Sequence, residues 1–494
     1  MTLSLHEKLN SLVRSFSGFY PETALVLLFI LLIFSDLIFH KRTGKPTGWV
    51  ALLGLGSVLF LSGDQYSPES AEKQLFFLGL LQTNNLIIFF KCLAGALTIL
   101  TILFSWTEQK AYARSGEFYV ILTALLLGLH LMLMSATLLM LYLAIELVSV
   151  ASYILTSFSD SRKSAGGGLR YILFGAMSSG VMLYGMSWLY GLTGSLTFTE
   201  PAFWTTLAAQ PALLANAALV LTSSGLLFKI AAVPFQVWAP DVYQAAPIAV
   251  VAFFSVAPKV IALVVLLTAS QAGAAHWPGF GSFMATISLA SITVGNFAAL
   301  VQRNARRMLA YSSVAHTGFL LIGIVSNSLF ALQSFVFYSV VYLFMNLAAF
   351  VLLHWLERST GSEEMTDYQG LGLRRPWVGI ALVIVMIALA GLPPTAGFTA
   401  KLLLFSALWE TYQNTGDPLL LALFGGGLVT VAVSIFYYLR IPYFMFFRKS
   451  NQGENPAYPV RWAEALLLAG LLIPVLLLFF KSDLLTEFLG ILLR

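Results

Sequence analysis

Five ionisable side chains lie within long apolar stretches of the chain. Lys229 and Lys259 lie near the middle of theirs, and Glu146 is about the tenth residue of a twenty-residue run. Lys401 follows a double proline, and His316 lies one helical turn after a serine in LAYSSVAHTGF. A charge at the centre of a bilayer costs at least ~2.5–3.5 kcal/mol, so such residues usually mark an ion or proton pathway. We predict that these five residues carry protons.

Structural ion pairs inside a helix bundle are the competing interpretation of these charges. Four buried charges would cost roughly 10 kcal/mol or more before pairing, and pairing or hydration has to offset that cost. His316 alone would fit a hydrogen-bonded core histidine, but its serine-containing span favours a proton relay. Lys91 lies about seven residues from the end of its apolar run, within snorkelling reach of the interface, and is predicted to be structural.

Prolines interrupt two of the stretches that carry these lysines. A proline lacks the backbone N–H and clashes with the carbonyl four residues back, so Pro234 should free the carbonyl of Ile230, next to Lys229. In a bilayer such freed groups are tolerated only where they face protein or water. The prolines expected to break helices are Pro234, Pro240, Pro393 and Pro394.

The whole composition predicts an all-α, polytopic membrane protein. Hydrophobic residues make up 59% of the 494 and charged residues only 10%, with a mean hydropathy of +0.85. Runs of about 20 apolar residues predict transmembrane helices. Fourteen are expected, near 21–39, 48–63, 84–106, 116–133, 137–157, 169–190, 212–238, 248–270, 281–301, 307–325, 329–355, 377–410, 418–446 and 463–480. The run at 377–410 is too long for one straight span and should break at its double proline.

The positive charges predict the orientation of these spans. Outside the spans, eighteen Lys and Arg residues fall on one side of the alternation and five on the other. Positive residues concentrate in cytoplasmic loops, so both termini should lie on the non-cytoplasmic side. The five are Lys8, Arg14, Lys73, Lys481 and Arg494.

The two interrupted spans, the seventh and the twelfth, are five spans apart. An offset of five reverses orientation, which predicts two inverted five-helix repeats. The expected segments are 1–110 with three helices, 111–270 as the first repeat (helices 4–8), 271–450 as the second (helices 9–13), and 451–494 as a C-terminal helix and tail.

Several functions are excluded by residues that the chain lacks. Its one cysteine, Cys92, rules out a cysteine-ligated iron–sulfur cluster and a disulfide framework. No GxGxxG unit joins a strand to a helix, and the histidines have no HExxH spacing. The pI of about 9.1 comes from short basic loops, so nucleic acid is not an expected partner.

Four motifs in order give a specific resemblance over nearly the whole chain. They are FKIAAVPFQVWAPDVYQAAP, the Pro258-Lys259 span, QRNARRMLAYSSVAHTGF and GLPPTAGFTAKLLLF. The chain resembles the antiporter-like subunits of bacterial NADH-quinone oxidoreductase (complex I), and among them subunit N, equivalent to mitochondrial NADH dehydrogenase subunit 2. The lysine at position 401 and the short C-terminal segment favour N over the sister subunits M and L.

This resemblance implies roles for the buried charges. Glu146 resembles the glutamate of the fifth helix, the partner of the lysine in the broken seventh helix, which is Lys229 here. Lys259 resembles the central lysine of the eighth helix, and Lys401 the ionisable residue of the broken twelfth helix. A proton would pass from Lys229 to Lys259, then through the His316 region to Lys401.

The implied function is proton translocation coupled to NADH oxidation and quinone reduction, as a non-redox subunit. No cofactor would bind this chain, while NADH, FMN, iron–sulfur clusters and quinone would bind partner subunits. Expected partners are the other membrane subunits of complex I, especially M and K, together with lipids of the bacterial inner (cytoplasmic) membrane. A cation/proton antiporter subunit and a hydrogenase-linked ion pump remain the alternatives.

Overall fold

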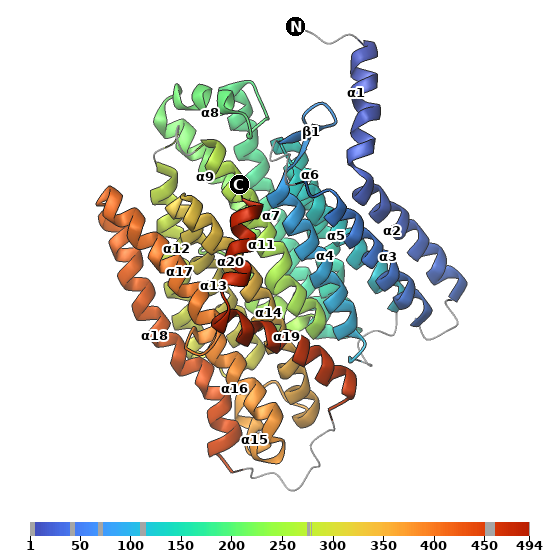
Figure 1. The fold of residues 1–494 in the computed structure, drawn as a ribbon, viewed down its shortest axis with the longest axis vertical. Helices are drawn as coiled ribbons and strands as arrows, with labels where there is room; N and C mark the ends of the chain where they lie inside the picture. Colours follow the sequence, from blue (N-terminus) through green and yellow to red (C-terminus); the bar gives the residue numbers. More distant parts are fainter. Residues whose placement is uncertain are drawn as a thin grey trace. The chain divides into compact units, whose positions relative to one another are not determined.

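The computed structural model describes residues 5–39, 45–67, 73–108, 115–273, 277, 279–449 and 460–493, and most of them are helical (Figure 1). Thirteen of the described helices are long and apolar enough to cross a membrane, and each coincides with a predicted span. The remaining predicted span, 377–410, is a pair of shorter helices. The all-α, polytopic fold is confirmed, and thirteen of the fourteen predicted spans are matched by a described helix of sufficient length and apolarity.

The chain divides into two compact units. The first consists of residues 1–229, 260–278 and 491–494, and the second of residues 230–259 and 279–490. The first unit contains α1 (Leu5–Gly18), α2 (Tyr20–Phe39), α3 (Lys45–Asp64), β1 (Gln74–Phe76), β2 (Leu81–Thr83), α4 (Asn85–Ser105), α5 (Ser115–Met134), α6 (Leu138–Thr156), α7 (Arg162–Thr193), α8 (Pro201–Ala208), α9 (Ala212–Lys229) and the C-terminal part of α11 (Ile248–Gly273).

The second unit begins inside the first helix break. It contains η1 (Phe235–Val237), α10 (Trp238–Ala245), the N-terminal part of α11, α12 (Gly279–Val301), α13 (Ala305–Ser326), α14 (Leu329–Thr360), η2 (Met365–Tyr368), α15 (Leu371–Arg374), α16 (Pro376–Ala390), α17 (Ala396–Thr415), α18 (Pro418–Phe447), α19 (Trp462–Phe480) and most of α20 (Asp483–Leu492).

The seventh span breaks where Pro234 predicts it. Helix α9 ends at Lys229, and the chain resumes as a helix only at η1 and α10. The carbonyl of Ile230, freed as expected, accepts a hydrogen bond of 2.9 Å from the Thr317 hydroxyl of α13. Both residues are buried, so this bond satisfies a group that would otherwise be costly in the interior.

Pro240 was wrongly predicted to break a helix. It is the third residue of α10, which runs on to Ala245. In the first turn of a helix the N–H has no intrahelical partner, so a proline there removes nothing. A further difference is the antiparallel hairpin of β1 and β2, which apolarity alone did not indicate.

The twelfth span breaks at the predicted double proline. Helix α16 ends at Ala390, followed by Gly391 in the left-handed conformation (φ +80°), and α17 starts at Ala396. Glycine adopts that conformation without the steric cost of a Cβ. The last carbonyls of α16 therefore point into the break, where an interior side chain can bind them.

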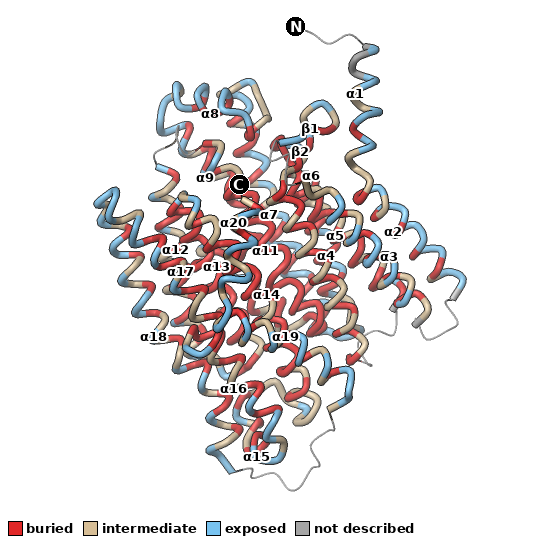
Figure 2. Tube along the Cα trace, in the orientation of Figure 1, coloured by how far each residue is buried: buried red, intermediate tan, exposed pale blue. Residues whose placement is uncertain are grey.

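Helices α11 and α13, which carry Lys259 and His316, are the most deeply buried of the candidate spans, followed by α14 (Figure 2). In α11, α13 and α14 the most apolar window is 100%, 94% and 89% buried, against 33% in α2 and 28% in α18. Helices α12 and α13 approach closely, since a Cβ at Gly295 would lie 2.6 Å from the backbone nitrogen of Ala315. Small residues permit such contacts between membrane helices, and here they fix the position of α13.

Some predictions fall on residues outside the described part of the chain. Among the charges used for orientation, these are Lys41, Arg42, Lys110, Arg114 and Arg494. The side of the membrane on which the termini lie, the inverted repeats and the four-segment division stay predictions.

Candidate functional site

Lys259 lies on α11, which continues as a helix through Pro258. Its ammonium group is buried and donates a 2.7 Å hydrogen bond to the Ser313 hydroxyl on α13. The Tyr243 hydroxyl of α10 lies 3.2 Å from the same serine oxygen, and the ammonium nitrogen lies 5.7 Å from the centre of the tyrosine ring. One hydroxyl and one aromatic face thus replace the water that a lysine would have at the surface.

His316 lies on α13, one turn beyond that serine, and both its ring nitrogens have partners. Nδ1 is 2.6 Å from the Tyr338 hydroxyl of α14, and Nε2 is 3.0 Å from the Tyr438 hydroxyl of α18. Tyr438 is also hydrogen-bonded to Ser312. A neutral imidazole has one donor and one acceptor nitrogen, and hydroxyls can serve either, so this cluster can reverse its hydrogen bonds.

Lys401 occupies the second helix break. Its ammonium group, on the first turns of α17, donates hydrogen bonds of 3.0 Å to the carbonyl of Leu389 and 2.7 Å to that of Ala390. These are carbonyls at the C-terminus of α16, where the helix dipole also favours a positive charge. The Phe319 ring of α13 covers the ammonium group at 4.9 Å.

Lys229 and Glu146 belong to the first unit. Lys229 is the last residue of α9 and is buried, and its Nζ has no hydrogen-bond partner in the described part of the chain. The centre of the Tyr171 ring lies 6.0 Å from Nζ. Glu146, on α6, is half-buried and likewise leaves Oε1 without a partner. The carboxylate acts electrostatically on Lys229, although no ion pair within 4 Å joins the two described side chains. Their charges interact without being locked together.

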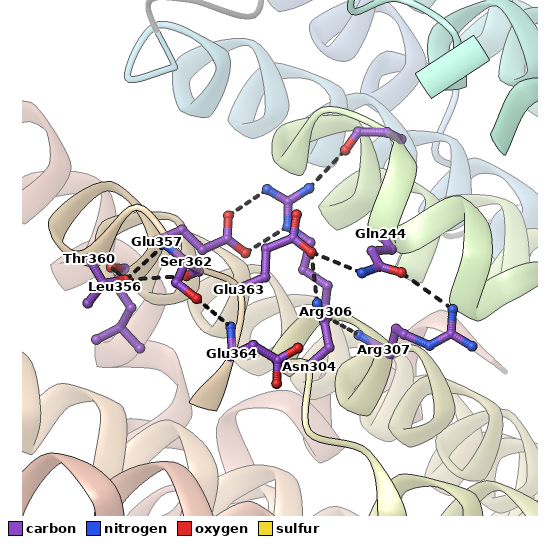
Figure 3. A network of polar contacts seen from close by, with 11 residues as sticks. Gln244, Asn304, Arg306, Arg307, Leu356, Glu357, Thr360, Ser362, Glu363 and Glu364 are labelled. Carbon is purple, nitrogen blue, oxygen red and sulfur yellow. Dashed lines mark hydrogen bonds and ion pairs between the residues drawn. The ribbon is translucent and has the colours of Figure 1, made fainter. Parts of the chain in front are cut away.

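A polar network fixes the segment after the first break (Figure 3). Arg306, at the start of α13, binds Glu357 of α14 through two hydrogen bonds of 2.7 and 2.5 Å. It also donates one of 3.1 Å to the carbonyl of Ala246, just after α10. Arg307 pairs with Asp241 of α10 at 2.7 Å. Bidentate arginine–carboxylate contacts restrict the orientation of the two side chains as well as their distance. This network therefore sets the position of α10 relative to α13.

Lys91 was expected to be structural and within snorkelling reach of the interface, but its side chain does not snorkel. It is fully buried and forms an ion pair of 2.8 Å with Glu22 of α2, whose same oxygen lies 3.0 Å from Nδ1 of His130 on α5. A counter-charge inside the helix bundle removes the reason for the lysine to reach the interface. Sequence reasoning missed Glu22 and His130, although both lie within predicted spans and could have been counted with the other intramembrane charges.

The tyrosines around His316 were also missed. Tyr338 and Tyr438 are buried, but nothing in an apolar helix separates a tyrosine that packs from one that bonds a histidine. Thr317 was missed for the same reason, because a threonine that only packs looks the same in the sequence as one that bonds a freed carbonyl. The partners of these three residues depend on which helices lie next to one another.

Within the second unit, these contacts form three polar clusters, centred on Lys259, His316 and Lys401. No hydrogen bond between described residues joins one cluster to the next. Both lysines nevertheless act electrostatically on the imidazole, so protonation of any one group affects the others. Among the described residues no group of three or more His, Cys, Asp or Glu could hold a metal ion.

Such a fold and site define a class: a polytopic helical membrane protein with two broken helices and buried ionisable groups beside them. A sequence profile of the family described as "NADH:quinone oxidoreductase/Mrp antiporter, TM" matches residues 135–428. NADH-quinone oxidoreductase subunit N of Anaeromyxobacter sp. is 36% identical, with 94% of each chain covered. NAD(P)H-quinone oxidoreductase subunit 2 of Acaryochloris marina is also 36% identical, over 85% of this chain and 80% of that one.

A solved structure of respiratory complex I from Thermus thermophilus contains a chain of similar fold. Its TM-score is 0.78 at 29% identity, with 94% of this chain and 98% of that chain covered. A chain of the Mrp complex from Dietzia sp. superposes with a TM-score of 0.80 at 19% identity, over 96% and 97% of the chains, which is a likeness of fold. The protein belongs to the NADH:quinone oxidoreductase/Mrp antiporter family of membrane subunits. The resemblance to subunit N, inferred from four motifs, is confirmed.

Proposed function

We propose that this chain is the antiporter-like subunit N of an NADH-quinone oxidoreductase and carries protons across the membrane. The observation that supports this most is the series of three buried groups in one unit: Lys259 on serine, His316 between two tyrosines, and Lys401 on the carbonyls of a broken helix. Each group can change protonation without a change of fold. A scaffold would have no need for charges at such expensive positions.

In the proposed cycle, the protonation state of one lysine controls the protonation state of the next lysine. A nearby carboxylate stabilises an ammonium ion, and burial destabilises it. When Glu146 moves away from Lys229 or is neutralised, Lys229 loses its stabilising charge and releases a proton toward Lys259. The proton then passes through His316 and its tyrosines to Lys401. Water bridges the gaps that protein hydrogen bonds leave.

The energy for this cycle comes from elsewhere in the complex. We propose that this subunit is non-redox and that NADH, FMN, iron–sulfur clusters and quinone bind partner subunits. The direct neighbours are other membrane subunits, subunits M and K in particular. The location is the bacterial inner membrane, with both termini on the non-cytoplasmic side.

The decisive experiment uses the assembled complex in proteoliposomes, with proton uptake and NADH-dependent quinone reduction recorded together. Lys259→Ala should leave assembly intact and strongly reduce pumping. Lys259→Arg should also fail to restore it, because an arginine does not release its proton. Thr268→Val is the matched control, since that hydroxyl bonds only Val264 of its own helix, at 3.0 Å.

Two results would overturn the proposal. Wild-type pumping in Lys259→Ala would remove the central lysine from the pathway. A chain that purifies alone and exchanges Na⁺ for H⁺ in liposomes would instead identify a subunit of a cation/proton antiporter.

A further inference from the structure

A second buried ionisable cluster lies outside the groups used so far. Glu22, Lys91 and His130 come from α2, α4 and α5 of the first unit, and all three are at most 1% exposed. They precede the segment that the family profile matches. Glu22 Oε1 contacts both the lysine at 2.8 Å and the histidine at 3.0 Å.

The cluster has an unused proton acceptor. An ionised carboxylate cannot donate, so the Nδ1 that faces Glu22 carries the hydrogen, and Nε2 is the basic nitrogen. His130 Nε2 and Glu22 Oε2 are both buried, and neither has a hydrogen-bond partner among the described residues. Around a neutral imidazole the charges of Glu22 and Lys91 cancel, and one added proton on Nε2 would be stabilised by the same carboxylate.

A polar cavity lies on the other side of Gln65 from the cluster. Its volume is about 750 Å³, and its lining includes Arg14, Tyr20, Gln65 and Asn85. The amide oxygen of Gln65 accepts a 3.3 Å hydrogen bond from Lys91, and its amide nitrogen donates to the carbonyl of Gly18 at 2.6 Å. Ile88, one turn before Lys91 on α4, also lines the cavity. The cavity thus reaches to within one side chain of the buried ammonium group.

Among the described residues, four other charged or titratable groups lie near the cluster or its cavity. The Tyr20 hydroxyl, two residues before Glu22, donates to Asp64 at the end of α3 at 3.2 Å. Cys92 is the next residue after Lys91 in the chain. Arg14 of α1 lies at the cavity and is exposed.

We propose that Glu22, Lys91 and His130 form a second proton-transfer site, which opens through the cavity beside Gln65. A proton arrives on His130 Nε2, and the Nδ1 proton passes to Glu22. Lys91 gives one proton to water in the cavity and takes the proton from Glu22, so one proton enters and one leaves. Rotation of the neutral imidazole by about 180° then turns its N–H back toward Glu22 and restores the starting state. The N-terminal helix α1 lines this cavity, so the predicted orientation makes it an outlet on the non-cytoplasmic side.

This proposal rests on the proposed function, because it adds an outlet to a proton-translocating chain. A proton-transfer site and a structural ion pair predict different effects of conservative substitutions at Lys91 and His130. Lys91→Arg keeps the charge opposite Glu22 but does not release a proton. His130→Gln keeps a hydrogen bond to Glu22 and has no titratable nitrogen.

The test measures proton pumping per quinone reduced in the assembled complex, over a range of pH. A positioned proton-transfer group contributes at least about 10²-fold, so each variant should lose pumping by roughly that factor and should lack one ionisation in its pH profile. Thr98→Val is the control, because its hydroxyl bonds only Ala94 of the same helix, at 2.8 Å. Infrared difference spectra between two pH values should show an imidazole signal that His130→Gln removes.

The outcomes separate this proposal from the proposed function. If Lys259→Ala stops pumping while Lys91→Arg and His130→Gln pump normally, the cluster is a structural ion pair and the main pathway stands. If Lys259→Ala pumps normally, the proposed function fails whatever the cluster does. If the complex that carries Lys91→Arg does not assemble, His130→Gln is the remaining test. Wild-type pumping by His130→Gln with an unchanged pH profile overturns the proposal.

Discussion

Gly391→Ala tests whether the space left by Gly391 in the second helix break is needed to position the Lys401 side chain. Gly391 has φ +80°, and a Cβ built on it would lie 2.5 Å from Cδ and 3.0 Å from Nζ of Lys401. The left-handed conformation costs a non-glycine residue about 1–2 kcal/mol. Overpacking a tight interior adds about 1–3 kcal/mol, and here the flexible lysine is the group that must move. We expect Lys401 to leave the carbonyls of Leu389 and Ala390, with a large loss of pumping.

Gly416→Ala is the matched control on the same helix pair. Gly416 ends α17 with φ +67°, but nothing lies within 4 Å of a Cβ there. It should show only the conformational cost of about 1–2 kcal/mol, seen as a lower thermal midpoint of the complex with pumping retained. Both variants place an alanine in the left-handed conformation. The difference between their thermal midpoints and pumping rates therefore reports the contact with Lys401.

A double-mutant cycle completes the argument. With Lys401→Ala already present, the clash is gone, and Gly391→Ala should destabilise the complex no more than Gly416→Ala does. The assay is the thermal midpoint of the purified complex, together with pumping in proteoliposomes at matched subunit levels. Equal effects of Gly391→Ala and Gly416→Ala in the wild-type background would refute the reasoning.

Three further predictions follow from other parts of the chain. Thr317→Val leaves the buried carbonyl of Ile230 without its 2.9 Å hydrogen bond and should lower the stability of the complex by about 1–3 kcal/mol. Thr430→Val is its control, because the Thr430 hydroxyl bonds the carbonyl of Gly427 in its own helix. Equal thermal midpoints for the two variants would contradict this prediction. Glu146→Gln and Lys229→Ala should each impair pumping, and the double variant should be no worse than either, because coupled residues are not additive; additive losses would show two separate roles. Single cysteines at Ser161 and Arg448 should react with membrane-impermeant reagents only from the cytoplasmic side, and labelling from the other side would reverse the orientation.

Composition and proline positions predicted the membrane-spanning helices and the two places where they are interrupted. Apolar runs about as long as the bilayer is thick can form little else, because only helices satisfy their own backbone there. Pro234 and the Pro393-Pro394 pair marked the two breaks, and Lys229, Lys259 and Lys401 were identified as buried from the apolar residues around them. These are local properties, which the sequence states directly.

Which groups bind those charges was decided only by the tertiary structure. A membrane helix is apolar on all sides, so its sequence lacks the facial pattern that would tell which side meets which neighbour. Ser313, Tyr338 and the α16 carbonyls meet Lys259, His316 and Lys401 because α11, α13, α14 and α17 pack together. For the same reason Lys91 looked able to snorkel until the packing of α2 against α5 brought Glu22 and His130 to one point. Pro240 was misjudged because only the path of the chain after the break shows that a new helix has just begun there.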